Sequence, residues 1–124
     1  MLRYEPPVQL SFRLATQEVE LSGTKIPAGS LVLGIVTSAN RDERIFEQPD
    51  RFLPGRNKGN QHLTFGHGIH FCLGSQLARM EARLGLEALA SRISAIRLRS
   101  PEVQWIPGYT MHGPAVLPVE LVPA

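Results

Sequence analysis

The strongest structural signal in this sequence is a segment at about residues 75–93 that has the pattern of a helix apolar over most of its circumference. It is rich in Leu, Ala, Glu and Arg, which favour helix, and Gly85 is its single glycine. A narrow polar line is formed by Gln76, Arg79, Arg83 and Glu87. Such a helix is normally buried on several sides. Since no second helix of similar strength is predicted, we expect this one to need more protein than the 124 residues supply.

The first third of the chain predicts β structure. Apolar and polar residues alternate with a period of two at residues 10–14 and 19–21, which indicates strands. Arg13 would lie on the polar face of the first strand. A turn is predicted at 22–24, and the nearly continuous apolar run at 31–36 predicts a buried strand.

The middle of the chain, residues 37–74, shows little periodicity and is punctuated by Pro and Gly. A short helical turn is expected at about 38–44. Long structureless segments within a compact domain are uncommon and tend to be functional. This one contains the single cysteine, Cys72, and three of the four histidines, so the chemistry of the protein is expected here.

The residues after the long helix predict short strands at about 103–106 and 116–122, and Pro118 would force the second of these to an edge or a bulge. With 124 residues, 43% of them hydrophobic, the chain is large enough for one domain with a modest core. The sequence therefore predicts an α+β chain.

Composition excludes several classes of function. The net charge is +2 and no Lys/Arg run is present, so a nucleic-acid partner is not expected. No apolar run approaches the 18 or so residues of a membrane span, and residues 1–7 lack the apolar core of a signal peptide. A cytoplasmic protein that does not bind membranes is therefore expected. A single cysteine rules out an internal disulfide.

The most informative stretch is Phe-Gly-His-Gly-Ile-His-Phe-Cys-Leu-Gly at 65–74, directly before the predicted helix. It places the thiol of Cys72 in a glycine-lined loop at a helix N-terminus. Helix dipoles and free backbone N–H groups favour a thiolate in such a position. Taken alone, these residues allow a reactive cysteine, a metal ligand or a haem ligand.

The neighbours of the cysteine add detail to this loop. Gly66 and Gly68 permit tight turns and let the backbone lie near a flat ligand, while Gly74 lets backbone donors approach the sulfur. Phe65 and Phe71 are placed to shield the sulfur from water, which would tune the potential of a ligated metal.

Simpler interpretations stand beside these. A small zinc cluster is conceivable from His62, His67, His70 and Cys72. The chain lacks the paired-cysteine spacing of structural zinc sites, so ordinary loop histidines are favoured at 62 and 67. Arg13 would ordinarily be a solvated charge, and the polar line of the long helix a solvated face or, more weakly, a surface for docking a redox partner.

The ordered pattern F-G-x-G-x-H-x-C-x-G resembles the cysteine-ligand loop of the cytochrome P450 family, and every position of it is matched. The segment at 2–8 is similar to the end of the family's E-x-x-R helix, and 12–16 to the strand whose arginine pairs with a haem propionate. Further similarity to bacterial members lies at 21–29, 38–42 and 49–52, so the resemblance covers essentially the whole chain.

The resemblance implies a haem b (iron protoporphyrin IX) cofactor, with Cys72 as the axial thiolate ligand of the haem iron. Arg13 and His70 would contact the propionates. The cofactor-binding set would then be Arg13, Phe65, Gly66, His70, Cys72 and Gly74. The substrate side of the pocket would be lined by Val8, Gln9, Leu10 and the segment from Met111 to Val116, and Arg3 and Arg51 would be structural.

By the same resemblance, residues 1–124 are the C-terminal haem-binding part of a mainly α fold: a small β-sheet, the cysteine-ligand loop, one long helix and C-terminal strands. The parent enzyme would be a monooxygenase that oxidises a small organic substrate with O₂, and electrons would come from NAD(P)H through a ferredoxin or flavoprotein.

The upstream part of that domain is expected to be missing, since the Glu of E-x-x-R would fall one position before Met1. The isolated chain is therefore expected to be inactive. The alternative is a truncated remnant, or a haem-binding fragment without catalysis, whose apolar helix is covered by the missing N-terminal part or by self-association.

Overall fold

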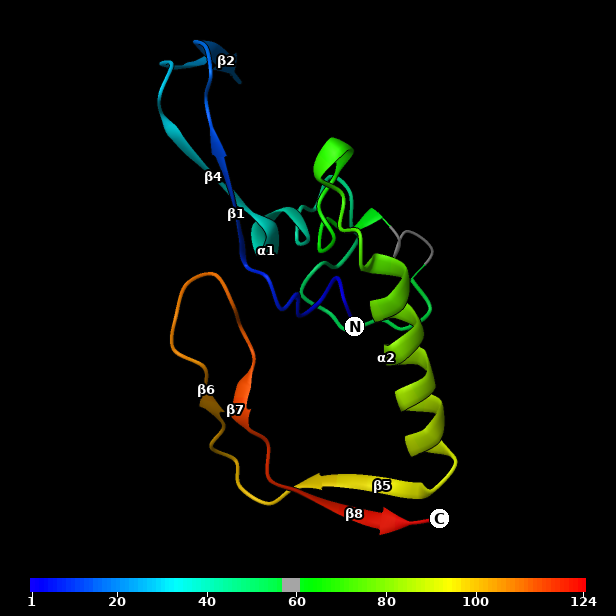
Figure 1. The fold of residues 1–124 in the computed structure, drawn as a ribbon. Coiled ribbons are helices and arrows are strands. Elements are labelled where there is room, and N and C mark those ends of the chain that lie inside the picture. The colour runs from blue at the N-terminus through cyan, green and yellow to red at the C-terminus, as the bar shows by residue number, and fades with distance from the viewer. Residues whose placement is uncertain (57–60) are drawn as a thin grey trace. The chain divides into compact units, whose positions relative to one another are not determined.

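The computed structural model describes residues 1–56 and 61–124 (Figure 1). It divides into two units, which are described separately. Unit 1 comprises residues 1–64 and 108–112, and unit 2 comprises residues 65–107 and 113–124.

The strands of unit 1 form two antiparallel pairs. β1 (Leu10–Leu14) pairs with β4 (Leu31–Ile35), and β2 (Val19–Leu21) pairs with β3 (Thr24–Ile26). The two residues that join β2 to β3, Ser22 and Gly23, have φ of 50° and 80°. Positive φ at both positions is typical of a type I′ turn, whose twist matches that of the strands it joins. The predicted strands and turn are confirmed.

The run at 31–36 was predicted to be a buried strand. A strand is present, but it is not buried. Leu31, Leu33 and Ile35 are 65%, 50% and 54% exposed. They alternate along one strand of a two-stranded ribbon, and that ribbon leaves their face open to solvent. Val36 is buried, but it opens the short helix α1 (Val36–Ala39), which begins two residues before the predicted helical turn.

The core of unit 1 surrounds a buried arginine. Arg3 donates from Nη1 to the carbonyl oxygen of Asn40 at 2.7 Å and from Nη2 to that of Arg51 at 3.3 Å. Its guanidinium lies 5.2 Å from the ring centre of the buried Phe46. Burial lowers the pKa of Arg3, and the nearby cations of Arg56 and Arg41 lower it further. The charge is thus held by carbonyl oxygens and an aromatic face, which are what a buried cation needs.

Residues 108–112 complete unit 1 from far along the chain. Met111 forms a β-bridge with Val8. On either side of it, the N–H of Gln9 donates to the carbonyl of Thr110, and the N–H of His112 to that of Pro7, each at 2.8 Å.

Unit 2 contains the 3₁₀ turn η2 (Gly68–His70), the helix α2 (Ser75–Ala90) and four strands. β5 (Ile93–Leu98) pairs antiparallel with β8 (Val119–Pro123), and β6 (Gln104–Trp105) with β7 (Pro114–Val116).

The long helix begins where it was predicted but ends at Ala90, three residues before the predicted end. Ser91 caps it, its hydroxyl donating to the carbonyl of Ala88 at 3.0 Å. Ile93 then opens β5, a strand that the sequence did not predict. Pro118 lies between β7 and β8, where it removes no ladder donor, and its carbonyl accepts from the N–H of Arg99 at 3.0 Å.

The apolar side of α2 is not covered within this chain. Leu77, Met80 and Leu84 are 54%, 48% and 52% exposed, and Ser75 is the buried residue of the helix. This agrees with the expectation that the helix needs more protein around it. Among the described residues, no helix is long and apolar enough to cross a membrane.

Candidate functional site

The loop before α2 is shaped by two glycines in the left-handed region. Gly66 has φ of 73° and Gly68 φ of 67°. A Cβ on Gly66 would lie 3.3 Å from the carbonyl oxygen of His70, closer than side chains normally approach a backbone atom. The tight turns predicted at these two positions are therefore present, and at Gly66 both the conformation and the space demand glycine.

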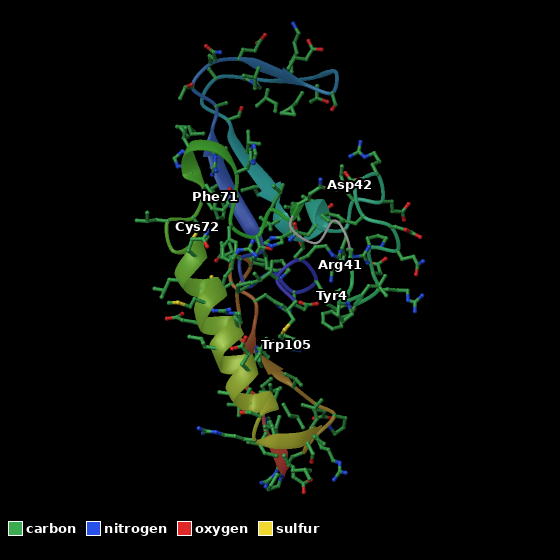
Figure 2. All side chains as sticks on the ribbon, turned by 90° about the vertical axis from the view of Figure 1, so that its right-hand side faces the viewer. Tyr4, Arg41, Asp42, Phe71, Cys72 and Trp105 are labelled. Atoms are coloured by element: carbon green, nitrogen blue, oxygen red, sulfur yellow. The ribbon has the colours of Figure 1, made fainter. Side chains whose placement is uncertain are left out.

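Three backbone hydrogen bonds close the loop around Cys72. Its N–H donates to the carbonyl of Phe65 at 2.8 Å, and the N–H of Phe71 donates to the carbonyl of Gly68 at 3.0 Å. The carbonyl of Cys72 accepts from the N–H of Ser75 at 3.2 Å, which joins the loop to the first turn of α2. The Cys72 thiol is exposed at this end of the helix (Figure 2).

The helix N-terminus beside the thiol has no compensating acid. Gly74 is the N-cap residue and supplies no side-chain cap, and the first turn of α2 contains no Asp or Glu. No acidic side chain in the first turn therefore offsets the positive end of the helix dipole.

The conformation of the loop does not require a glycine at position 74. Its φ of −82° suits any residue, and an added Cβ would lie 4.0 Å from Sγ of Cys72, an ordinary contact. The glycine therefore keeps one side of the sulfur clear.

The two aromatic residues of the loop pack on each other. The rings of Phe65 and Phe71 meet edge-to-face, with centroids 6.4 Å apart, and the guanidinium of Arg79 lies 5.0 Å from the Phe65 ring centre. Because Phe71 is 52% exposed and Cys72 is exposed, the predicted shielding of the sulfur is incomplete in this chain. Arg79 was predicted to lie on a solvated face, but it is half-buried, and its guanidinium on α2 contacts the Phe65 ring of the loop.

The predicted propionate partners lie in different units. His70 is the last residue of η2 and is exposed. Arg13 lies on β1 of unit 1, also exposed, and donates from Nη1 to Ser11 Oγ at 2.9 Å and to the carbonyl of Phe12 at 2.7 Å. Their roles toward a haem stay predictions.

Of the predicted substrate-side residues, Val8, Gln9, Leu10 and Met111 share one part of unit 1, whereas residues 113–116 belong to unit 2. Val8 and Met111 are bridged, Gln9 is bonded to the residue before Met111, and Leu10 opens β1. The structure thus brings Met111 to the N-terminal segment across about the length of the chain. A substrate-lining role for this group stays a prediction.

The histidines give the zinc alternative no support. His62 is buried in unit 1, where its Nδ1 accepts from the N–H of Thr64 at 3.3 Å, while His67 precedes η2 in unit 2. In the part of the chain that the structure describes, no three His, Cys, Asp or Glu residues are grouped as metal ligands.

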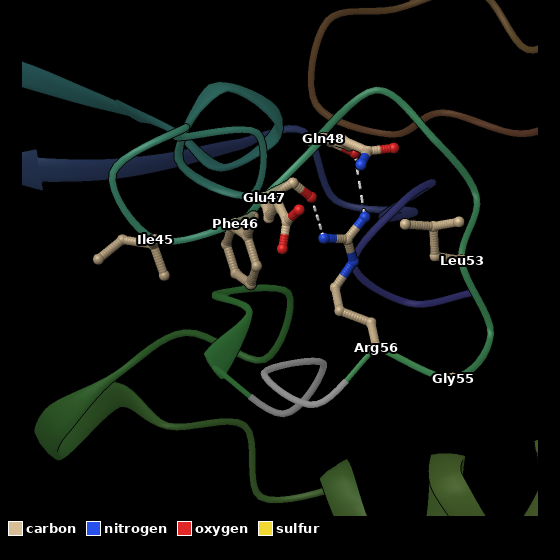
Figure 3. A pocket seen from close by; sticks show the side chains of 7 residues that line it. All are labelled: Ile45, Phe46, Glu47, Gln48, Leu53, Gly55 and Arg56. Atoms are coloured by element: carbon tan, nitrogen blue, oxygen red, sulfur yellow. Dashed lines mark hydrogen bonds between the residues drawn. The ribbon is translucent and has the colours of Figure 1, made fainter.

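One cavity in unit 1 was not predicted from the sequence. Its volume is about 380 Å³, and an arginine side chain spans it (Figure 3). The guanidinium of Arg56 donates to the carbonyls of Glu47 and Gln48, the latter at 3.0 Å. Backbone oxygens therefore satisfy this cation inside the cavity. The lining residues are Ile45, Phe46, Glu47, Gln48, Leu53, Gly55 and Arg56.

Comparison with known proteins decides the family. Residues 1–101 match the family model described as Cytochrome P450. The chain belongs to the cytochrome P450 family. It is 44% identical over 122 residues to the cytochrome P450 monooxygenase PikC of Streptomyces venezuelae, and 40% identical over 118 residues to the biotin biosynthesis cytochrome P450 of Bacillus subtilis.

These matches cover 96% and 95% of this chain but 29% and 30% of the two relatives, so the chain spans about a third or less of their length. Among solved structures, that of the cytochrome P450 CYP109Q5 from Chondromyces apiculatus is similar with a TM-score of 0.92 and 46% identity. That match covers 99% of this chain and 32% of the other. The fold is therefore a portion of the cytochrome P450 fold.

Cytochrome P450 relatives use haem b, and the loop fits that cofactor. The exposed Cys72 supplies a sulfur donor, which is one of the axial ligands found on haem iron. The glycine beside it, Gly74, keeps one side of the sulfur clear.

Proposed function

We propose that this chain supplies the thiolate loop of a haem-dependent monooxygenase, with Cys72 as the axial ligand of the haem iron. The observation that carries the proposal is the exposed Cys72 thiol, held in a backbone-closed glycine loop at the uncompensated N-terminus of α2. Membership of the cytochrome P450 family supports it.

The residues of the loop would have separate roles. Cys72 would bind the metal through its sulfur, at the N-terminal end of α2. Gly66 and Gly74 keep backbone and sulfur accessible to a flat cofactor. His70 and, from β1, Arg13 would donate charge-assisted hydrogen bonds to its carboxylates. When bound, a thiolate-ligated haem activates O₂ for insertion into organic substrates.

The parent activity follows from the family and is proposed at the level of reaction class. Relatives named for oxidations include the PikC monooxygenase and the mycinamicin IV hydroxylase/epoxidase of Micromonospora griseorubida. We propose an O₂-dependent oxidation of a small organic substrate, with electrons delivered by a ferredoxin or flavoprotein, in an assembly that includes more of the domain than this chain.

The ligand assignment is tested by titrating the purified chain with haem, reducing it and adding CO, alongside Cys72→Ala and Cys72→Ser. A Soret band at the wavelength from which the family takes its number, lost in Cys72→Ala, is the expected result. Thr24→Val, an exposed substitution on β3 of unit 1, serves as a control that should leave the band unchanged.

Two results would contradict the proposal. One is a haem band that persists unchanged in Cys72→Ala, which would assign the ligand elsewhere. The other is a chain that takes up no haem even when it is combined with the preceding part of a cytochrome P450 domain.

A further inference from the structure

A buried asparagine of unit 1 holds the two residues that precede the ligand loop in the chain. Asn40, the C-cap residue of α1, is 1% exposed. Its Oδ1 accepts from the backbone N–H of Leu63 at 2.7 Å, and its Nδ2 donates to Oγ1 of Thr64 at 3.1 Å. A single buried amide thus holds two consecutive residues, one through the main chain and one through the side chain.

The hydrogen bonds continue beyond that amide. The hydroxyl of Thr64 donates to the carbonyl of Leu2 at 2.8 Å, and the carbonyl of Asn40 accepts from the buried Arg3 at 2.7 Å. Segments at residues 2–3, 40 and 63–64 are therefore tied by polar contacts in one place. Fully satisfied buried networks of this kind rigidify the chain and specify one arrangement.

Leu63 and Thr64 are the last two residues before the loop. The next residue, Phe65, provides the carbonyl that accepts the Cys72 N–H. At the other end, Ser75 ties the loop to α2. A loop is ordered when both of its ends are fixed, and the fixed leading end here depends on Asn40 and Thr64.

We infer that Asn40, acting through Leu63 and Thr64, is a positioning residue for the Cys72 loop. The functional significance of this positioning rests on the proposed function. The positioning itself does not, because the order of the loop can be measured without haem. Sequence reasoning missed it because a lone Asn in an aperiodic segment carries no pattern that marks it as buried.

The test compares amide hydrogen exchange by NMR in the full chain without cofactor. The reporter is the Cys72 N–H, and the reference within unit 2 is the Arg99 N–H, which donates to Pro118. In Asn40→Ala, we expect the ratio of Cys72 to Arg99 exchange rates to rise by about tenfold, the effect of losing one typical hydrogen bond.

Thr64→Val and Thr64→Ser form a second, milder pair in case Asn40→Ala does not fold. The valine keeps the shape but loses both hydroxyl contacts, while the serine keeps the hydroxyl. The exchange ratio should rise in Thr64→Val and return to the starting value in Thr64→Ser. Thr16→Val, the same change at an exposed site, should leave it unchanged.

A ratio that stays constant in Thr64→Val, or a uniform rise at both amides, would overturn the inference, since either describes general stability rather than positioning. The haem spectrum of Cys72→Ala tests the proposed function separately. The exchange ratio could rise in Thr64→Val while the haem band stays unchanged in Cys72→Ala. That pair of results would reject the proposed function and retain the inference.

Discussion

Gly66 bears the strictest steric demand in the ligand loop, since its φ is positive and a Cβ there would press on the carbonyl of His70. We predict that Gly66→Ala lowers the free energy of unfolding by about 1–2 kcal/mol or more and weakens haem uptake. Gly85→Ala, in the middle of α2 with no atom near its Cβ, should instead raise that free energy by up to about 1 kcal/mol. Urea denaturation of both variants checks the contrast, and equal effects would contradict it.

The pair Asp42 and Arg44 makes a local pH prediction. Hydrogen bonds from the side chain and backbone of Arg44 lower the pKa of the Asp42 carboxyl to about 2. A lowered pKa contributes stability above the unfolded-state pKa, and that contribution is lost as pH falls through about 2. In Arg44→Gln the Asp42 titration should move up toward the ordinary aspartate range. Carbonyl NMR of Asp42 across pH 1–6 measures the shift; an unmoved midpoint would assign the lowering to another group.

At the scale of single residues, the sequence predicted the backbone conformation of the glycines in the motif. The turns at Gly66 and Gly68 are where they were predicted. The stacking of Arg79 on Phe65 and the burial of Asn40 were not found, because both depend on which segments meet in space. An arginine on a polar helix line and an asparagine in a loop are most often solvated.

Among the elements, the β2–β3 hairpin is the most local and the easiest to adjust. Its type I′ turn has Ser22 at φ 50°, a conformation that asparagine tolerates better than serine. Ser22→Asn should stabilise the hairpin by less than about 1 kcal/mol, and Gly23→Ala should destabilise it by a similar amount or more. Cross-strand NOEs between Val19 and Ile26, followed with temperature, report the change; a weaker hairpin in Ser22→Asn would contradict the turn assignment.

The end of α2 shows why element boundaries were harder to predict than element types. The apolar stripe continues through Ile93, so the periodicity favours helix up to that residue. In the structure Ile93 pairs with Pro123 in the β5–β8 ladder. That pairing joins residues about thirty apart and overrides the local preference, as tertiary contacts commonly do. By contrast, β2 and β3 are joined by a two-residue turn, and there the alternation and the turn residues were sufficient.

At the scale of the whole chain, exposed apolar side chains are the dominant surface feature. Leu77 and Leu84 on α2 are about half exposed, as are Leu33 and Ile35 on β4. Contiguous apolar surface favours association. We predict that the isolated chain self-associates, and that Leu84→Glu shifts it toward monomer while changing the free energy of unfolding by no more than about 0.5 kcal/mol.

Sedimentation velocity over a range of concentrations measures this shift. Gln76→Glu adds a similar charge on the polar line of the same helix and serves as the matched control. If both variants dissociate the chain equally, charge rather than apolar contact would be the cause. A wild-type chain that stays monomeric at high concentration would contradict the prediction of self-association.

The bridge between Val8 and Met111 has a consequence for the order in which the protein is made. Ribosomes release a chain from its N-terminus, so the β2–β3 hairpin has both of its strands as soon as residue 26 emerges. The residues that pair with Pro7 and Val8, and the carbonyl that accepts from the Gln9 N–H, emerge more than eighty residues later. Unit 1 therefore receives its last backbone partners, at residues 110–112, only after most of unit 2 has been synthesised.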